Sequence, residues 1–146
     1  MAKYPAAGHS YIEVDDAGGV PRNLSPYVEE VEPLGRQVSW RDVTGLNDEA
    51  PQVTAGTEPA QEFNLRGIFD DTPVSGPDAV LAGIIGRVVT VSYGPAGRQA
   101  GRRKITGEFL CLGYQVGGKA GPGAGDGLVR FSARFRQSGA VVVTVW

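Results

Sequence analysis

The 146-residue sequence contains a single cysteine and a single histidine, Cys111 and His9. One cysteine cannot form an internal disulfide, and one histidine excludes most metal sites and catalytic triads. No apolar run approaches the roughly 20 residues that span a bilayer, and no charged-then-apolar leader segment is present. We therefore expect a chain that folds in a reducing cytoplasm, contacts no membrane, holds no metal or cofactor and catalyses no reaction.

The chain also has little excess of either positive or negative charge. Charged residues make up 21% of the chain and the formal net charge is −2, with an isoelectric point of about 5.4. This balance excludes a nucleic-acid-binding domain of the basic type. Glycine and proline are abundant instead: 22 glycines and 10 prolines occupy 32 of the 146 positions. The glycines follow no collagen-like period, so this composition indicates ordered strands that are joined by many turns.

Alternation of apolar and polar residues recurs along the chain and predicts strands. The expected strands are residues 10–14, 20–24, 28–32, 37–43, 61–70, 88–93, 105–116, 128–136 and 140–146. A turn at Gln137-Ser138-Gly139 separates the last two. One helix is expected at about residues 76–85, because Pro77 suits a first helical turn and Gly86 can end the helix. The predicted fold is mainly β, a β-sandwich or barrel with one short flanking helix.

Breaker-rich segments divide the chain. Residues 1–9 are predicted to be an N-terminal arm, and residues 10–146 a single β-sandwich domain. This domain contains three long loops, residues 44–60, 94–104 and 117–127. Loops of this length are usually functional or become ordered on a partner. Because ordering them costs conformational entropy, we expect a neighbouring subunit to stabilise them.

Catalytic candidates are few. The pairs Asp15-Asp16 and Asp70-Asp71 lie beside glycine or proline, where aspartate commonly bonds the backbone of a turn. Cys111 lies between two leucines in a predicted strand and is expected to be a buried, inert thiol. His9 lies in the arm without a partner at metal-ligand spacing. These residues favour structural roles over catalysis.

Charge is distributed unevenly. Residues 1–80 hold 14 acidic and 5 basic side chains, whereas residues 81–146 hold 2 acidic and 9 basic ones. Three interpretations stay open: acidic and basic strands pair within the domain, the basic half contacts phosphate, or opposite faces attract other copies head to tail. The basic residues considered for phosphate contact are Arg98, Arg102, Arg103, Lys104, Arg130, Arg134 and Arg136.

The order of these features resembles the tail tube (major tail) proteins of long-tailed bacteriophages, over Tyr11 to Trp146. The matching segments are Tyr-Ile-Glu-Val-Asp-Asp at 11–16, Leu-Ser-Pro-Tyr-Val-Glu-Glu-Val at 24–31, Asp-Val-Thr at 42–44, Glu-Phe-Asn-Leu-Arg-Gly-Ile-Phe-Asp-Asp at 62–71, Gly-Pro-Asp-Ala-Val-Leu-Ala-Gly at 76–83, Ile-Thr-Gly-Glu-Phe-Leu at 105–110 and Phe-Arg-Gln-Ser-Gly-Ala-Val at 135–141. The resemblance implies a β-sandwich with one flanking helix, assembled as hexameric rings that stack into a hollow tube. It further implies that the long loops and the arm bridge rings, and that DNA passes through without sequence-specific contact.

The partners that follow are other copies of the chain, other virion proteins and DNA in passage, with a location in the virion tail after assembly in the host cytoplasm. The acidic excess of the first half is expected to line the DNA conduit, since a basic lining would bind phosphates. The residues predicted to lie at subunit interfaces are Arg98, Arg102, Arg103, Lys104, Asp48, Glu49, Glu58, Asp70 and Asp71. Two alternatives remain open: a phage capsid decoration protein, and a small β binding module or enzyme.

Overall fold

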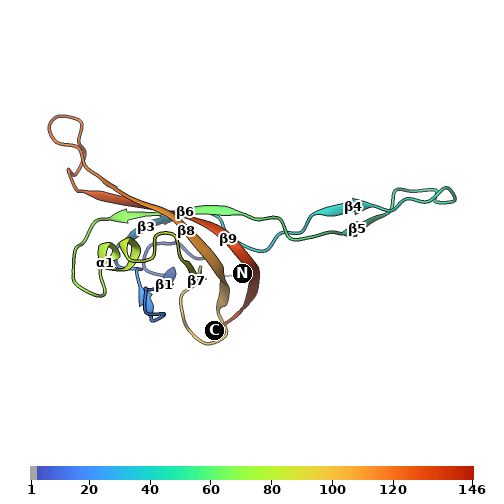
Figure 1. Cartoon of the computed structure of the whole chain (residues 1–146), viewed down its shortest axis with the longest axis horizontal. Coiled ribbons are helices and arrows are strands. Elements are labelled where there is room, and N and C mark those ends of the chain that lie inside the picture. Colours follow the sequence, from blue (N-terminus) through green and yellow to red (C-terminus); the bar gives the residue numbers. More distant parts are fainter. Residues whose placement is uncertain (1–2) are drawn as a thin grey trace.

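The computed structural model of the chain describes residues 3–146; Met1 and Ala2, the start of the predicted arm, lie outside the described residues. In the described part, nine strands and one short helix follow one another (Figure 1). They are β1 (Tyr11–Asp15), β2 (Pro21–Asn23), β3 (Val28–Val31), β4 (Trp40–Asp42), β5 (Val53–Ala55), β6 (Glu62–Ile68), α1 (Pro77–Ala82), β7 (Val88–Gly94), β8 (Arg103–Gly117) and β9 (Arg130–Val145). The prediction of a mainly β fold with one short helix is confirmed.

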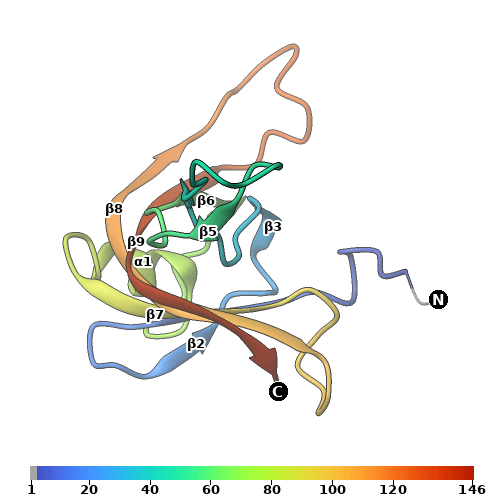
Figure 2. The same ribbon diagram turned by 90° about the vertical axis from the view of Figure 1, so that its right-hand side faces the viewer.

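Seven strands form one antiparallel sheet in the order β2-β1-β7-β8-β9-β6-β3. The sheet curls into half a barrel, and α1 lies inside the curve (Figures 1 and 2). The long strands β8 and β9 pair over most of their length and form the centre of the sheet. Strands β2 and β3 are its outer edges, so the half barrel stays open in the single chain.

The hydrophobic core lies between the inner face of the sheet and α1. Alternation in β6 and β9 sends Phe63 and Phe135 inward, where their rings stack at 5.2 Å between centroids. Phe109 of β8 meets Phe63 edge to face at 4.9 Å, a favourable geometry for aromatic pairs. Val80 and Leu81 of α1 complete the core and are almost fully buried. These contacts attach the helix to the centre of the sheet.

Gly67 of β6 permits a close approach of the edge strand β3. A Cβ atom on this glycine would lie 2.2 Å from the carbonyl oxygen of Tyr27 and 2.8 Å from Cα of Val28. The backbone of Ile68 also donates to the same carbonyl at 2.8 Å. Any side chain at position 67 would therefore push β3 away from the sheet.

The turn predicted at residues 137–139 is wrong. The chain continues through them as a single strand, β9, and the register with β8 shifts between Gly107 and Phe109. Gly139 adopts a positive φ of 145° opposite Glu108, which is typical of a β-bulge. The bulge bends the long strand, and this bend replaces the predicted hairpin.

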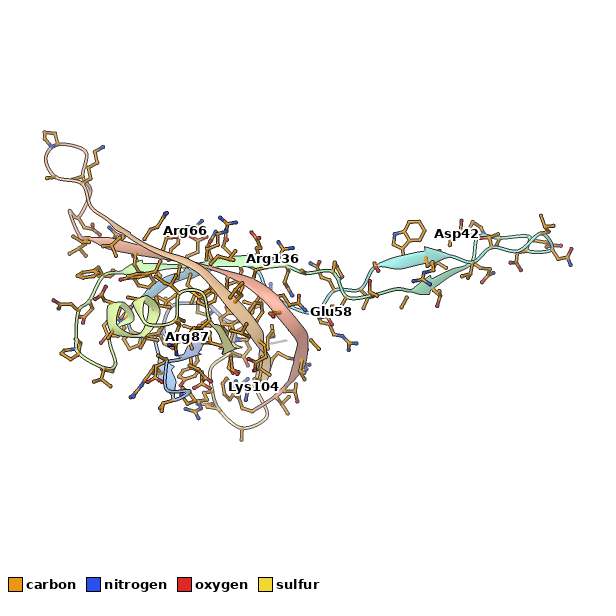
Figure 3. All side chains as sticks on the ribbon, viewed as in Figure 1. Asp42, Glu58, Arg66, Arg87, Lys104 and Arg136 are labelled. Carbon is orange, nitrogen blue, oxygen red and sulfur yellow. The ribbon has the colours of Figure 1, made fainter. Side chains whose placement is uncertain are left out.

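Further boundaries differ from the prediction, and the strand expected at residues 37–43 is reduced to β4, Trp40–Asp42. The helix ends at Ala82, because the chain leaves the helical path in a turn that reaches Gly86 with a φ of 78°. Within the segment predicted as the loop 44–60, residues 53–55 form β5, which pairs with β4. The two strands form a long hairpin that projects from the body (Figures 1 and 3).

Candidate assembly interface

The projecting hairpin, residues 38–57 and here termed the hairpin arm, carries apolar side chains in solvent. Its large exposed residues are Val38, Trp40, Val43, Leu46 and Val53. Trp40 has 72% of its surface exposed, and Leu46 at the tip is fully exposed. Two paired strands alone are marginally stable in water. An apolar, two-stranded arm of this kind is typical of a segment that packs on a partner.

The tip of the hairpin arm is acidic and is held by its own turn. The backbone amide of Gly45 donates to the Asp48 carboxylate at 2.6 Å. Glu49 follows it and is exposed. At the base of the arm, Glu58 accepts hydrogen bonds from Gln137 Nε2 at 2.9 Å and from the Val141 amide at 3.3 Å. Glu58 therefore anchors the arm to β9, whereas Glu49 points to solvent.

The ribbon of β8 and β9 has two bare edges on opposite sides. Strand β7 pairs with residues 105–110 of β8, and β6 pairs with residues 130–136 of β9. Beyond these, residues 112–117 of β8 and 142–145 of β9 each have one edge without a strand partner among the described residues. Bare edges of this length are sites for strand addition.

The bare end of β9 is also apolar on both faces. Val142 on one face and Val143 and Val145 on the other are 52%, 42% and 51% exposed. A strand that is buried on one face normally alternates apolar and polar residues. Valines on both faces therefore indicate a strand that is covered on both sides by something other than its own chain.

The predicted loop 94–104 is shorter in the structure, because Gly94 ends β7 and Arg103 and Lys104 begin β8, where they pair with Val145 and Thr144 of β9. The predicted basic residues of this region, here termed the basic loop, each have a different environment. Arg98 lies 3.8 Å from Glu13 and stacks on Trp146 at 5.5 Å from the ring centre. Lys104 lies over the same indole at 4.5 Å. These two side chains are engaged within the chain through cation–π contacts.

Arg103 is exposed, whereas Arg102 is partly buried. Arg102 stacks on Tyr4 at 5.1 Å from the ring centre and donates to its hydroxyl. Arg103 donates to the Thr144 carbonyl at 3.4 Å. Neither guanidinium forms an ion pair with another part of residues 3–146. Of the four basic residues, only Arg98 has an ion-pair partner within residues 3–146, so Arg102, Arg103 and Lys104 carry charge that a partner can use.

Asp70 and Asp71 lie in the turn that precedes α1. The Thr72 hydroxyl and amide donate to the Asp70 carboxylate, and these hydrogen bonds lower the pKa of Asp70. Asp16 likewise accepts from the amides of Gly18 and Val20. For Asp70 and Asp16, the interpretation as turn-forming residues agrees with these contacts. The structure does not bring Asp70 and Asp71 together with the hairpin tip or the basic loop.

Four arginines lie on the exposed face of the central strands, opposite the core, and each pairs with a carboxylate. Here termed the arginine face, it comprises Arg66 of β6 and Arg130, Arg134 and Arg136 of β9. Their partners are Glu29, Glu30, Glu32, Glu62 and Asp126. The predicted pairing of the two oppositely charged halves is found in the contacts of Arg130 with Glu29 and of Arg134 and Arg136 with Glu62, whereas Arg66 pairs within the acidic half. The alternation of β6 and β9 was visible in the sequence, but the register that joins these charges was not.

The structure also places the cysteine and the acidic side chains that the sequence offers as candidates for catalysis or metal binding. Cys111 is fully buried, and this burial raises the pKa of its thiol. In residues 3–146, no group of three or more histidine, cysteine, aspartate or glutamate side chains could hold a metal ion.

A groove of about 740 Å³ runs along the bare edge of β3, between residues 6–12 and Val28–Val31. No helix in the described part is long and apolar enough to cross a membrane.

Comparison with known proteins gives similarity in structure alone. No protein-family model matches the sequence, and no curated protein matches it. A chain of the "Virion of native gene transfer agent (GTA) particle" aligns with a TM-score of 0.67 and 16% identity, covering 97% of this chain and 100% of that one. A chain of the "Tail of empty GTA particle computed with helical refinement, C6 symmetry" gives 0.68 and 14%, with the same coverage.

An extracellular contractile injection system, described as "PVC sheath/tube terminator in extended state", provides a third similar chain. Its TM-score is 0.63 at 11% identity, and the alignment covers 99% of this chain and 100% of that one. The chain under study therefore has, over nearly its whole length, the fold found in these tail and injection-system particles.

Proposed function

We propose that the chain is the structural subunit of a bacteriophage-type tail tube, which assembles into stacked rings around a channel for DNA. The observation that carries this proposal is the β8–β9 ribbon, whose two bare edges lie on opposite sides. The fold shared with a chain of a gene transfer agent tail supports it. The chain acts by self-assembly and needs no catalytic centre.

Pairing of the two edges is a head-to-tail contact. Residues 112–117 of one copy supply one edge, and residues 142–145 of the next copy supply the other. Because the two surfaces differ, such contacts build a closed ring or an open helix. Closure removes every unpaired edge of the ribbon. The C6 symmetry of the similar tail favours six copies in a ring.

The hairpin arm and the N-terminal arm then join neighbouring subunits. We expect the apolar side chains of the hairpin arm to pack on an adjacent copy, and the loops 94–104 and 117–127 to become ordered in the assembly. The predicted interface charges divide into two roles. Asp48 and Glu49 at the hairpin tip and Arg102 and Arg103 of the basic loop make contacts between copies, while Arg98, Lys104, Glu58, Asp70 and Asp71 shape the surfaces within one copy. This protein belongs in the virion tail and assembles in the host cytoplasm.

Electron microscopy of the purified protein tests this function. We expect rings or tubes to form from the chain alone, at a rate that depends on protein concentration. A stable monomer or trimer that forms neither, and that binds only to capsid shells, would instead identify a decoration protein. A catalysed reaction in the groove along β3 would refute both structural roles.

Charge exchange tests the contact between the hairpin tip and the basic loop. Glu49→Lys and Arg103→Glu should each slow assembly at low ionic strength, and the two substitutions together should restore it. Because exposed ion pairs contribute only about 0–1 kcal/mol and are screened by salt, the single defects should diminish in 0.5 M salt. Glu49 is the better position than Asp48, because Asp48 also holds the tip turn. Single defects that the double variant does not restore would exclude this pairing.

A further inference from the structure

We propose that the carboxylates of the arginine face mask its arginines from DNA, and that this face lines the channel. The inference rests on the proposed function for the location of the face and deepens it by naming the surface that DNA passes. The observation behind it is a set of four strand arginines, each held against glutamate or aspartate. This arrangement differs from the simple acidic lining that the charge of the first half suggests.

The register of the sheet creates the pairs. Glu62 of β6 lies directly opposite Arg136 of β9. Its carboxylate oxygens form ion pairs with Arg136 Nη1 at 2.8 Å and with Arg134 Nη2 at 3.4 Å. Arg66, on the same face, lies 3.3 Å from Glu30 and 3.4 Å from Glu32. Both arrangements join residues that are far apart in the sequence.

The third pair lies at the far end of β9. Arg130 lies 2.8 Å from Glu29 and also bonds Asp126, with 2.8 Å between Nη1 and Oδ1. The face as a whole thus combines four arginines with five carboxylates, which leaves one net negative charge. Figure 3 shows Arg66 and Arg136 on the side of the sheet away from α1.

Ring geometry decides which face lines the channel. The helix α1 and the strands β1 and β7 lie on one side of the central ribbon (Figure 1), and the core lies on the same side. When the ribbon edges of successive copies pair, the ribbons form the wall of a ring. The side that carries the core and α1 is the thicker one, so it fits only at the larger radius and therefore lies outside. The arginine face is then left on the inside of the ring.

Unmasked arginines there would oppose transport. Each arginine that neutralises a phosphate releases counterions, which supplies most non-specific affinity for DNA. The side chains are half exposed, between 42% and 59%, so phosphates can reach them. A carboxylate within 4 Å of each guanidinium adds a repulsive charge at the same place and lowers that affinity. The arginines also join neighbouring strands across the face, since Arg136 of β9 contacts Glu62 of β6 and Arg66 of β6 contacts Glu30 of β3.

Substitution of the masking acids is the test. The full-length variant Glu30→Gln/Glu62→Gln frees Arg134 and Arg136 and weakens the hold on Arg66. Its binding to a fluorescein-labelled 20-base-pair duplex is measured by anisotropy from 50 to 200 mM KCl. The matched control is Asp42→Asn/Asp71→Asn, which changes the net charge equally at two exposed acids away from the face, neither of which is assigned a contact between copies.

The freed pair should give a salt slope of about −1.8, at about −0.9 per phosphate neutralised, so affinity should fall about tenfold across this range of salt. Wild type and the control should bind at least tenfold more weakly at 50 mM KCl. Adding Arg134→Gln/Arg136→Gln to the variant should abolish the gain. Circular dichroism confirms that each variant is folded.

Two outcomes would overturn the inference. One is equal binding by the variant and the control, which would show that net charge alone matters. The other is a gain that survives loss of both arginines. Either result can occur while wild-type protein still forms tubes, which leaves the proposed function intact. Conversely, unmasking without tube formation by the wild type would count against the proposed function and the location of the face in a channel, and would leave the masking of the arginines intact.

Discussion

Replacement of Trp40 by serine separates assembly from folding. The indole lies on β4 of the hairpin arm with 72% of its surface exposed. A buried tryptophan removes about 150–250 Å² from water, so about 140 Å² remains for a partner to cover in the middle of that range. At about 25 cal/mol per Å² this area is worth about 3.5 kcal/mol in the assembled state. Since each 1.4 kcal/mol is a factor of ten, Trp40→Ser should raise the critical concentration for assembly by roughly 100- to 400-fold.

The free energy of unfolding of the single chain should hardly change, within about 0.5 kcal/mol, because Trp40 contacts no core residue. Light scattering against protein concentration gives the critical concentration, and thermal unfolding followed by circular dichroism gives stability. Val20→Ser is the matched control, an exposed apolar residue outside the arm at 47% exposure. Unaltered assembly by Trp40→Ser, or a large loss of thermal stability, would refute the interpretation of the arm as a docking element.

Two further predictions concern the body of the fold. Gly67→Ala should lower the free energy of unfolding in urea by about 1–3 kcal/mol, because its Cβ would overlap the Tyr27 carbonyl; Gly83→Ala, whose nearest atom would lie at 3.4 Å, should not. Burial and the hydrogen bond to Asp78 raise the pKa of Tyr114. The folded state thus holds this proton more tightly, and the stability it adds below about pH 10 is lost as the pH rises. Tyr114→Phe should lower the free energy of unfolding by about 1 kcal/mol at pH 7, and its difference from wild type should become smaller above pH 10, where the wild type loses stability. A difference in the free energy of unfolding that stays the same across this pH range would contradict this.

The sequence predicts strands well where one face is buried. In β6, Phe63 and Leu65 turn inward and Glu62 and Asn64 outward, and the structure reproduces this alternation. The same rule fails for β5, whose three residues are exposed on both faces and therefore show no period. It also fails at Gln137-Ser138-Gly139, because a glycine beside polar residues is common both in turns and in bulges. A turn and a bulge at these residues are distinguished only by the long strand β8, which pairs with β9 on both sides of them. Such pairing is a tertiary property that the local sequence does not contain.

The interface could be foreseen only in outline. The long hairpin and the basic loop were visible as breaker-rich segments, yet the bare edges of the ribbon follow from the offset between β6, β7 and the longer strands that they pair with. That offset depends on register over the whole sheet. Valines at 142, 143 and 145 carried a signal, because an uninterrupted apolar run predicts a strand covered on both faces.

The uneven charge of the sequence has two structural outcomes that depend on where each residue lies. On the sheet, antiparallel register places Arg134 and Arg136 of the basic half against Glu62 of the acidic half, so attraction is satisfied within one copy. Glu49 at the hairpin tip and Arg103 at the start of β8 have no ion-pair partner among the described residues, and in the proposed assembly their attraction acts between copies. Internal pairing and assembly are therefore not competing explanations. Because the charges of the arginine face are paired within one copy, the proposed assembly leaves Glu49 and Arg103 to set the polarity with which subunits would meet, while apolar burial and edge hydrogen bonds would supply the affinity.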